Sequence, residues 1–549
     1  MISPESLLKL VPSVLVAFIG WNLVRRFVVP SPLDKLPGPS PKSFIAGHLP
    51  QMFAPDGWGF HRALVEKYGR VVKLYGFLRA RILYVSDPKA LHHIFIKDQH
   101  IFEESNAILG SNNAIFGEGL LSTLGETHKK QRRMLNPVFS IKQMRTMIPK
   151  FFAVTYDLRD VLLRKTVDGP QQVDMLTWTT RTALEIVAQA GLGQSFDPVS
   201  ETHEEHPYIS AMKLLGPTGR QLLMFRQFVL APVYKYKIGT PRIQRLLLGL
   251  VPSKALQRMR GLVDVMHETS LSIFEAKKKA LAESGDVRGG QDDFLSVLMR
   301  ENAKASEEDK LPDHQVVAQI STIMFAAMDT TSSALSRILH LLAEHPEVQD
   351  RLRAEIRGNV KQNGGGEPDY DQLSALPYLD AVIRETLRVH PPIASLPRET
   401  RKDALLPFSK PVKSTNGKYI SEVLVPKGTL VIVSIKAINT DPDVWGPDAQ
   451  EWKPERWLAP IPEAVVEAHV PGVYSHLMTF VGGGRACIGF KFSEMEMKVI
   501  LYVIIDLFRF SLPNSKEPIF WNMIGISTPF VNKDELRPAL PLVVSRADM

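Results

Sequence analysis

The chain has 549 residues, a formal net charge of +8 and a single cysteine, Cys487. One cysteine excludes an internal disulfide framework and a four-cysteine zinc site, and a chain without disulfides is typical of a reducing compartment. The modest positive charge suits nucleic acid, anionic lipid or an acidic partner, but the absence of zinc-finger, RNA-binding and helix-turn-helix patterns makes nucleic acid the least favoured.

The first 29 residues predict a single transmembrane anchor. No residue from 10 to 24 is charged, and with its apolar flanks the stretch is about long enough to cross a bilayer. Trp21 and the pair Arg25–Arg26 suit a membrane interface, and the basic residues after the stretch predict a cytosolic catalytic domain. The alternative is a cleaved signal peptide, but no small-residue cleavage site follows the apolar stretch.

Residues 30–45 contain five prolines, which predict a short, helix-free and semi-rigid hinge. Residues 46–549 are then expected to form one large catalytic domain. Alternating apolar residues predict a small sheet over 69–87 and further strands over 428–439. Most other segments carry apolar residues at helical spacing, so the predicted fold class is mostly α with minor β.

The longest predicted helix runs from about Asp313, expected to cap its start, to His345, where Pro346 ends it. At about 1.5 Å per residue it would span roughly 50 Å, the width of a whole domain. Asp329 and the hydroxyl run 330–333 argue against a membrane span and for a helix in the core. Asp329 is the only charged residue between positions 315 and 336, and a lone buried acid needs a partner or a function.

The cysteine lies in the loop FVGGGRACIGF, residues 480–490, just before another strong helical pattern. Because backbone N–H groups and the helix dipole favour a thiolate at this position, Cys487 is a candidate axial ligand for iron. The glycines, Gly489 included, are expected to let the loop approach a flat ligand closely. Phe480 could shield the sulfur, and Arg485 could reach a haem propionate. The alternative is an inert, buried cysteine.

The pattern F-x-x-G-x-R-x-C-x-G resembles the haem-binding loop of the cytochrome P-450 family, the haem-thiolate monooxygenases. The resemblance covers nearly the whole chain and is closest to fungal microsomal members. It implies haem b, with its iron bound by Cys487, and an oxidoreductase that acts on paired donors and incorporates one atom of O2. It also implies a location in the endoplasmic reticulum membrane and electrons from NADPH through a separate cytochrome P-450 reductase, with cytochrome b5 as a further candidate donor.

Two further motifs match the family. In ETLR (385–388) and PERW (454–457), the resemblance implies a buried structural network on the cysteine side of the haem, made of Glu385, Arg388 and Arg456. In AAMDTT (326–331) it implies an acid–alcohol pair, Asp329 and Thr330, that supplies protons during O2 activation. The alternative for Thr330 is that it only bends a buried helix. Ala327 departs from the usual glycine and is expected to narrow the space above the iron.

The resemblance assigns the haem propionates to Arg132, in the stretch 125–139, and to Arg398 after the ETLR helix, together with Arg485. His128 stands where the family usually has tryptophan, and an imidazole can still donate a hydrogen bond. The cations on the other faces of the 125–139 helix, Lys129, Lys130 and Arg133, predict a basic patch for the reductase, with an ordinary solvated face as the alternative.

The substrate is expected to be hydrophobic, with a terpenoid or another secondary metabolite favoured. Helical spacing and the variable segments of the family suggest eight pocket residues: Ile115, Phe116, Thr322, Ile323, Ala326, Ile393, Leu396 and Ile526. The apolar segment 220–238 is interpreted as either a membrane contact or a core helix. Two rival functions stay open, a haem-thiolate isomerase or dehydratase that needs no reductase, and a non-enzymatic haem carrier or sensor.

Overall fold

The computed structural model describes Gly20, Val24 and residues 28–196, 198–201, 206–283, 293–514, 518–523, 525–531 and 538–548. Most of the predicted anchor, residues 1–29, lies outside the described residues, so the anchor stays a prediction. Within the described part of the chain, no helix is both long enough and apolar enough to cross a bilayer.

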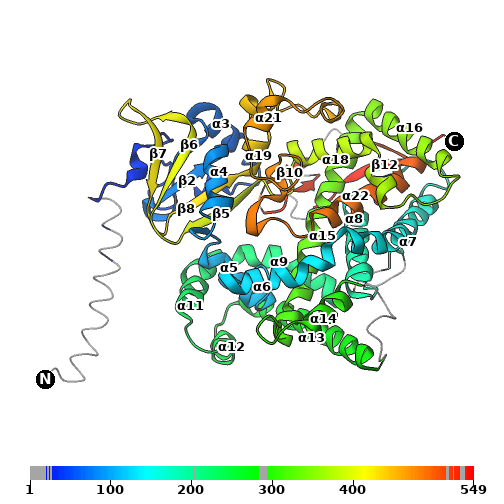
Figure 1. Ribbon diagram of the computed structural model, residues 1–549, viewed down its shortest axis with the longest axis horizontal. Helices are drawn as coiled ribbons and strands as arrows, with labels where there is room; N and C mark the ends of the chain where they lie inside the picture. Colours follow the sequence, from blue (N-terminus) through cyan, green and yellow to red (C-terminus); the bar gives the residue numbers. More distant parts are fainter. Residues whose placement is uncertain are drawn as a thin grey trace.

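Helices form most of the fold, as the apolar periodicity predicts (Figure 1). The longer ones are α3 (Trp58–Tyr68), α5 (Asn106–Phe116), α6 (Gly125–Leu135), α7 (Ile141–Lys165), α8 (Met175–Val187), α9 (Pro207–Gln221), α12 (Pro241–Gly249), α13 (Lys254–Glu283), α14 (Phe294–Lys304), α15 (Asp313–Glu344), α16 (Pro346–Gln362), α18 (Pro377–Val389) and α22 (Phe490–Leu507). Shorter helices and single turns include α2 (Leu49–Met52), α4 (Pro88–His92), α10 (Leu223–Phe225), α11 (Ala231–Tyr236), α17 (Tyr370–Ser374), α19 (Ile435–Asn439), α20 (Pro442–Trp445), α21 (Glu463–Glu467), η1 (Pro32–Lys35) and η6 (Arg226–Leu230).

The strands form one five-stranded sheet and three small ones. The main sheet has the order β1-β2-β8-β5-β3, and only the β2–β8 pair is parallel. Its strands are β1 (Val71–Tyr75), β2 (Arg81–Val85), β3 (Phe102–Glu103), β5 (Ser395–Thr400) and β8 (Leu430–Ser434). The small sheets are β6 (Ala404–Lys413) with β7 (Tyr419–Val425), β10 (Phe520–Asn522) with β11 (Thr528–Phe530), and β12 (Pro541–Arg546) between β4 (Gln171–Asp174) and β9 (Phe508–Ser511).

The sheet expected over 69–87 is confirmed as the antiparallel pair β1–β2. The segment 428–439 is a strand only in its first half, because Ser434 ends β8 and its hydroxyl accepts the backbone N–H of Ala437 at the start of α19. Consecutive residues of β8 from Val431 onward are buried, so both faces of the strand are covered, which explains its continuous apolar run. Sequence periodicity alone did not separate this buried strand from the short helix after it.

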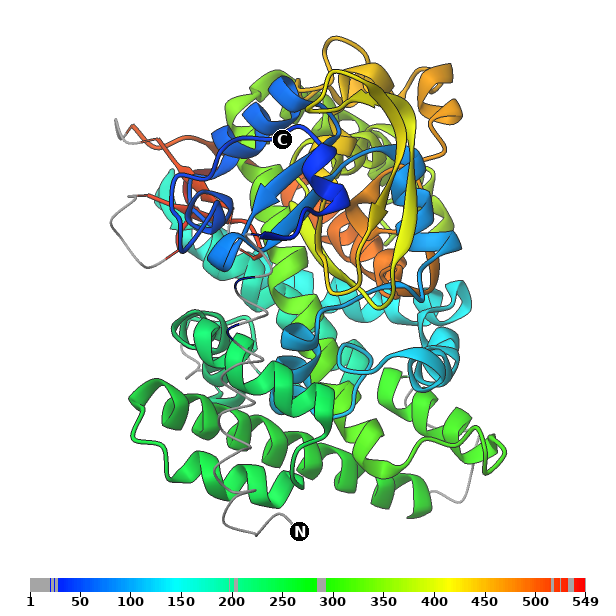
Figure 2. The ribbon, with the colours of Figure 1, turned by 90° about the vertical axis from the view of Figure 1, so that its left-hand side faces the viewer.

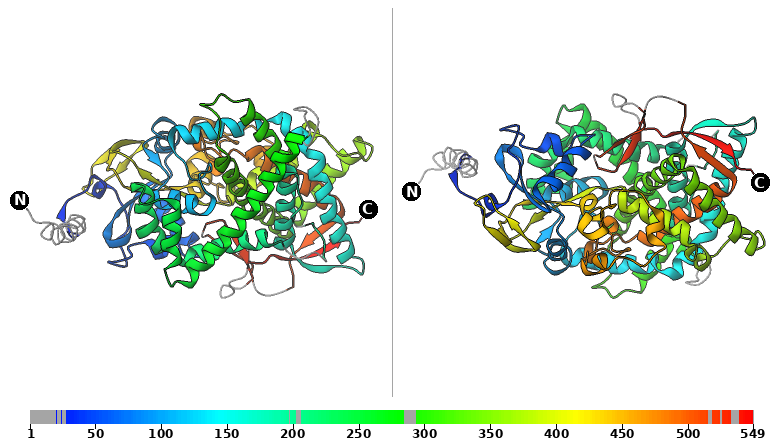
Figure 3. Two further views of the ribbon diagram at one scale, coloured as in Figure 1. Left: turned by 90° about the horizontal axis from the view of Figure 1, so that it is seen from below. Right: turned by 90° about the horizontal axis from the view of Figure 1, so that it is seen from above.

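The long helix α15 passes through the middle of the molecule, as predicted (Figure 1 and Figure 2). Most of its residues are buried against the main hydrophobic core. In Figure 3 the green helices α12 and α13 lie in front in the view from below. The expected capping by Asp313 is wrong: Pro312 takes the N-cap position, and the Asp313 carboxylate instead lies 2.7 Å from Lys278 Nζ.

The predicted hinge, residues 30–45, packs against the folded domain. Pro32–Lys35 form the turn η1, started by a capping box between Ser31 and Asp34, so the expectation of a helix-free spacer is wrong here. Leu33 and Leu36 are fully buried in the main core. Apolar burial therefore fixes this segment more firmly than its proline content suggests.

Candidate active site

A cavity of about 2680 Å³ lies between α15, α5, the η6–α11 segment and the cysteine loop. Cys487, Asp329 and Thr330 all line it. The Cys487 side chain is exposed to this cavity although protein surrounds it. The sulfur and the acid–alcohol pair, which are 157 residues or more apart in the chain, are thus brought to one internal space.

The glycines of the cysteine loop serve close contacts with other backbone segments. A Cβ on Gly482 would lie 1.9 Å from the carbonyl oxygen of Pro471, and one on Gly483, at φ +71°, would lie 1.9 Å from that of Phe95. Neither distance tolerates a side chain, and the positive φ also favours glycine. Gly482 and Gly483 therefore let the loop pack closely against the protein, and the expected approach of the loop to a flat ligand stays a prediction. Gly489 is the N-cap residue of α22.

The charge state of Cys487 reflects a competition. Burial raises the pKa of the Cys487 thiol, while the Gly489 backbone N–H and the Arg132 guanidinium act in the opposite direction. The backbone N–H of Gly489 is of the kind that the sequence predicts to favour a thiolate, and Arg132 adds a contribution that was not expected, but together they do not outweigh desolvation. A bound metal ion would add the missing stabilisation, because a coordinating thiol is deprotonated.

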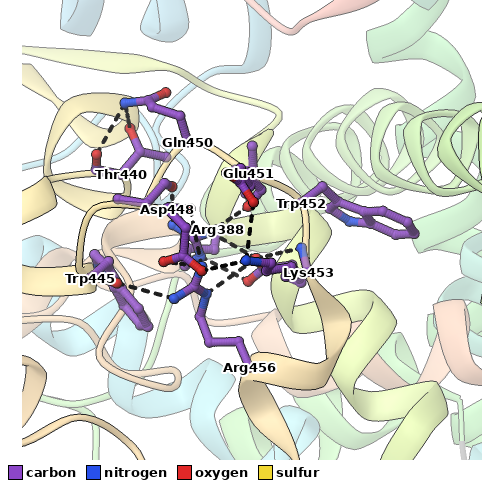
Figure 4. Close-up of polar contacts among 12 residues, drawn as sticks. Arg388, Thr440, Trp445, Asp448, Gln450, Glu451, Trp452, Lys453 and Arg456 are labelled. Atoms are coloured by element: carbon purple, nitrogen blue, oxygen red, sulfur yellow. Dashed lines mark hydrogen bonds and ion pairs between the residues drawn. The ribbon is translucent and has the colours of Figure 1, made fainter.

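The Glu385–Arg388–Arg456 network has the contacts expected from the sequence (Figure 4). Arg388 is fully buried and binds the Glu385 carboxylate in bidentate fashion, at 2.8 and 2.7 Å. It also donates to the carbonyl oxygens of Asn439, Ala449 and Glu451, at 3.0, 2.6 and 3.0 Å. Arg456 Nε lies 3.4 Å from Glu385. These bonds satisfy the buried charges, which burial would otherwise penalise heavily.

Asn439 connects this network to the cysteine loop. Its carbonyl accepts from Arg388, and its side chain accepts from the backbone N–H of Met478 and donates to Thr479 Oγ1, both at 2.8 Å. Thr479 in turn donates to the carbonyl of Leu387. Asn439 and Thr479 were not found by sequence reasoning, since isolated polar residues in a strand–helix segment and a loop carry no recognisable pattern.

Arg132 reaches the cysteine loop from α6. Its Nη1 donates to the carbonyl oxygen of Ala486 at 2.6 Å, next to Cys487. His128, one turn earlier, is buried, and desolvation together with Arg485 and Arg132 lowers its pKa to about 3. The imidazole is therefore neutral at physiological pH and keeps one N–H donor, as the sequence-based proposal for a propionate contact requires.

Two glutamates that the sequence analysis missed lie beside the other arginines. Glu104 is 3.2 Å from Arg485 and 3.5 Å from Arg398, and Glu103 is 3.5 Å from Arg485. Each glutamate keeps one buried oxygen without a hydrogen-bond partner among the described residues. Glu103 and Glu104 lie shortly after the predicted sheet, residues 69–87, in the chain. Nothing in the local sequence, however, indicates that β3 pairs with β5 and so brings these glutamates close to Arg398.

Asp329 and Thr330 face the cavity from α15. Burial raises the pKa of Asp329 to about 6, with Lys213 acting in the opposite direction, and no group among the described residues hydrogen-bonds its carboxylate. The Thr330 hydroxyl donates to the carbonyl of Ala326 at 2.8 Å. Ala327 packs against the main core and is not part of the cavity lining, so its methyl group does not narrow the cavity as expected.

Six of the eight suggested pocket residues line the cavity: Ile115, Phe116, Ala326, Ile393, Leu396 and Ile526. Thr322 and Ile323 do not. Thr322 is turned toward Gly119, whose added Cβ would lie 2.6 Å from Thr322 Oγ1, and Ile323 packs against the main core. The face of α15 that lines the cavity instead includes Ala318, Ser321 and Phe325. The helix is therefore oriented about its axis differently from what the choice of Thr322 and Ile323 assumed.

Phe480 lines the cavity beside Cys487 and packs edge-on against Tyr474, with ring centroids 5.4 Å apart. The basic patch expected on α6 is largely neutralised. Lys129 pairs with Glu126 at 2.7 Å, Arg133 pairs with Asp309 at 3.0 Å, and Lys130 donates to the carbonyl of Glu308 at 2.6 Å. Two of the three cations are therefore ion-paired, one within α6 and one with the turn before α15, which lowers the net positive charge predicted for this face.

The residues around the cavity fit a haem group. Cys487 and Arg485 line the cavity, whereas Arg132, Arg398 and His128 lie close to them but are not part of the lining. If a haem is bound, the three arginines would supply cations for its two propionates, with His128 as a neutral donor. Arg398 and Arg485 already form ion pairs with the neighbouring glutamates, Glu103 and Glu104. The net positive charge available to the propionates is therefore lower than the sequence suggests.

Comparisons with known proteins agree with this site. A sequence model of the family Cytochrome P450 matches residues 37–532. The chain is 50% identical over 547 residues to cytochrome P450 monooxygenase 91 of Postia placenta. This alignment covers 98% of this chain and 99% of that protein. It is 42% identical over 548 residues to ganoderic acid synthetase of Ganoderma lucidum, with 98% and 99% coverage.

A crystal structure of a cytochrome P450 superimposes on this chain with a TM-score of 0.70, and the match covers 93% of this chain and 100% of that structure. The sequence identity is 22%, so this likeness concerns the fold alone. The family match and the identity to monooxygenases along nearly the whole chain show that this protein belongs to the cytochrome P450 family of haem monooxygenases.

Proposed function

We propose that this monooxygenase inserts one oxygen atom from O2 into a hydrophobic terpenoid or another secondary metabolite, with electrons from NADPH through a separate reductase. The observation that carries the proposal is that Cys487 and the Asp329–Thr330 pair line one cavity. An axial sulfur ligand and a proton source on the same internal space are what a haem-thiolate oxygenase needs.

Cys487 would hold the haem iron, and Arg132, His128, Arg398 and Arg485 would hold its propionates. When bound, the haem supplies the O2 activation, and the protein supplies orientation, protons and exclusion of water. Thr330 offers a hydroxyl that can place a water molecule in the cavity, and Asp329 exchanges protons readily because its pKa of about 6 lies close to physiological pH. The apolar part of the lining would disfavour other water molecules near the reacting groups.

The substrate class is supported by the cavity and by the relatives. The surface that lines the cavity is mostly apolar, and its volume suits a large ligand. One relative, 42% identical, is named ganoderic acid synthetase, and another, 35% identical, is cytochrome P450 monooxygenase eriI of Hericium erinaceus. We therefore favour a terpenoid-sized secondary metabolite over a small, polar substrate.

Membrane association is part of the proposal. The uncharged stretch at residues 10–24 supports an anchor in the endoplasmic reticulum membrane, with the catalytic domain in the cytosol. The segment from α10 to α12 supports a second contact, because it exposes large apolar side chains, among them Leu223, Met224, Phe228, Leu246 and Leu250. Protease treatment of sealed microsomes tests this: the catalytic domain should be digested, and its protection would contradict the orientation.

The reductase is expected to approach on the cysteine side of the cavity, where α6 lies. Since ion pairs neutralise much of the α6 patch, we expect only a weak dependence of reduction rate on ionic strength. Cytochrome b5 remains a second candidate donor.

Reconstitution tests the function. The full chain is combined with a cytochrome P450 reductase, NADPH and a lipid extract, and products that gain one oxygen atom are sought by mass spectrometry. A product that gains one oxygen atom and forms only when both NADPH and the reductase are present supports the proposal. Turnover without reductase would favour an isomerase or dehydratase, and reversible haem binding without any turnover would favour a carrier or sensor.

A further inference from the structure

One charged side chain lies within the otherwise apolar segment that covers the cavity. Arg226, the first residue of η6, is the only charged residue between Arg220 and Lys235. Its neighbours Leu223, Met224 and Phe228 are exposed, whereas Arg226 is half-buried and lines the cavity. The segment therefore buries much of its single cation while several of its apolar side chains stay exposed, which is unusual for a surface turn.

The one hydrogen bond of the Arg226 side chain is to a neutral group. Arg226 Nε donates to Ser111 Oγ at 2.7 Å, and the Ser111 hydroxyl donates in turn to the carbonyl of Ala107, also at 2.7 Å. The two NH2 groups of the guanidinium have no partner among the described residues. Arg245, another arginine of the same cavity, differs: it binds the Asp264 carboxylate through both of its NH2 groups, at 2.6 and 2.8 Å.

The scaffold around Arg226 is tightly packed. A Cβ on Gly110 would lie 2.9 Å from the carbonyl oxygen of Leu230 and 3.0 Å from Tyr234 Cβ, so α5 and the η6–α11 segment approach as closely as a glycine allows. Tyr234 also donates a hydrogen bond to the carbonyl of Ser122 at 2.8 Å. Arg226 is thus held by two elements whose spacing is set by packing, which preorganises its free N–H donors.

The desolvation of the Arg226 guanidinium is not compensated by a nearby anion among the residues that the structure describes. Burial lowers the pKa of Arg226, and no neighbouring anion opposes that shift. An arginine nevertheless stays charged at physiological pH, so a desolvated cation remains beside the cavity. Arginine binds a carboxylate through two parallel N–H···O bonds, and the two free NH2 groups match that geometry.

We propose that Arg226 recognises a carboxylate on an otherwise apolar substrate and so orients the opposite end of the molecule toward Cys487. This rests on the proposed monooxygenase function and narrows its substrate class to amphiphilic acids. The partly buried guanidinium contributes both affinity and direction, because the rest of the ligand meets only apolar or neutral side chains along α5 and η6.

The test uses the haem-bound full chain in neutral detergent, titrated with two probe pairs while the Soret band is monitored. The pairs are palmitic acid with methyl palmitate, and oleanolic acid with its methyl ester. At least one acid should bind on the order of ten- to a hundredfold more tightly than its ester, the range expected for a charge-assisted hydrogen bond. Arg226→Gln should remove this preference, and Arg226→Lys should retain part of it.

Arg242→Gln, on the exposed start of α12, is the matched control and should leave the preference unchanged. Ser111→Ala should weaken the preference by loosening the guanidinium. Equal affinities for acid and ester in the unmodified protein, or no binding of either acid, would overturn the proposal. So would a preference that survives Arg226→Gln.

A parallel arm separates a lipid headgroup from a substrate carboxylate. Binding to phosphatidylcholine vesicles is compared with binding to vesicles that also contain phosphatidylserine. If Arg226→Gln changes only the response to the anionic lipid, the cation serves the membrane and the substrate proposal fails. The carbon monoxide difference spectrum of every variant reports the haem-thiolate centre separately, so loss of the proposed function itself would be visible as loss of that spectrum.

Discussion

The buried pair Glu385–Arg388 and the two cavity-lining charges Asp329 and Arg226 differ in how completely their charges are paired. On the cysteine side, Glu385 and Arg388 are fully buried, and each has several partners, including three backbone carbonyls on Arg388. On the opposite side, the Asp329 carboxylate and the NH2 groups of Arg226 have no hydrogen-bond partner among the described residues. Satisfied charges stabilise the loop that presents the sulfur, whereas unsatisfied charges remain available to protons and substrate.

The largest effect is expected at the sulfur. Cys487→Ala should abolish monooxygenase turnover and the red-shifted Soret band of the reduced, carbon monoxide-bound protein, because the cavity then lacks its only thiolate. Far-ultraviolet circular dichroism checks that the variant is folded, and Cys487→Ser provides a nearly isosteric comparison. Retention of the thiolate-type spectrum by folded Cys487→Ala would show that the axial ligand has been misassigned.

The next effect concerns the matched charges on the cysteine side. Glu385→Gln leaves Arg388 buried without its carboxylate, which should lower the free energy of unfolding by about 3–5 kcal/mol and reduce haem incorporation. The measurements are the thermal midpoint and the ratio of haem to protein. Glu451→Gln is the control, since its exposed carboxylate has Lys453 as its one ion-pair partner among the residues that the structure describes. Similar thermal midpoints for the two variants would mean that the network is not a major source of stability.

On the distal side, Thr330→Ala should keep haem and substrate binding but lower the product formed per NADPH consumed by about tenfold, with hydrogen peroxide rising in compensation. Asp329→Asn should slow turnover, because an amide does not relay a proton. Thr322→Ala is the matched control: its hydroxyl bonds the carbonyl four residues earlier on the same helix at 2.8 Å, as that of Thr330 does, but it faces away from the cavity.

Equal coupling in Thr330→Ala and Thr322→Ala would reduce Thr330 to a helix-bending threonine. The comparison between the two sides would then rest on Asp329 and Arg226 alone.

The smallest effect is a pH dependence of stability. Burial raises the pKa of Asp329 to about 6, above the unfolded value of about 3.9, so the folded protein binds more protons between these pH values. The stabilisation by the protonated form is complete below about pH 4 and is lost as the pH rises through about 6. It amounts to about 2–3 kcal/mol.

The thermal midpoint of the unmodified protein, relative to that of Asp329→Asn, should therefore fall between pH 4 and pH 7. A difference that is independent of pH would place the Asp329 carboxylate in contact with water rather than in a desolvated site.

Local sequence was sufficient wherever a motif is contiguous. The pattern around Cys487 predicted the family, which the comparisons confirm, and helical periodicity predicted α15 almost to its last residue. Glu385 and Arg388 lie three residues apart on one helix face, so their pairing could be read from spacing, and the family resemblance added Arg456.

Other features depend on contacts between distant segments. Glu103 and Glu104 reach Arg398 and Arg485 only because β3 pairs with β5, and Asn439 reaches Met478 only because α19 packs beside the cysteine loop. Arg133 meets Asp309 only because the turn before α15 packs against α6, and this contact could not be anticipated from α6 alone, since Asp309 lies 176 residues later in the chain. The partner of Lys129 is different, because Glu126 lies three residues earlier on the same helix and could be read from spacing.

The sequence by itself determined the chemistry of this protein, because the thiolate loop, the acid–alcohol pair and the buried ion pair are set by residue type and short spacing. Only the tertiary structure decided which charges remain unmatched. Whether a cation such as Arg226 meets an anion depends on which elements fold against it, and here the close contact of α5 with η6 and α11 supplies a serine instead of a carboxylate. Desolvation and pairing are properties of that packing rather than of residue type.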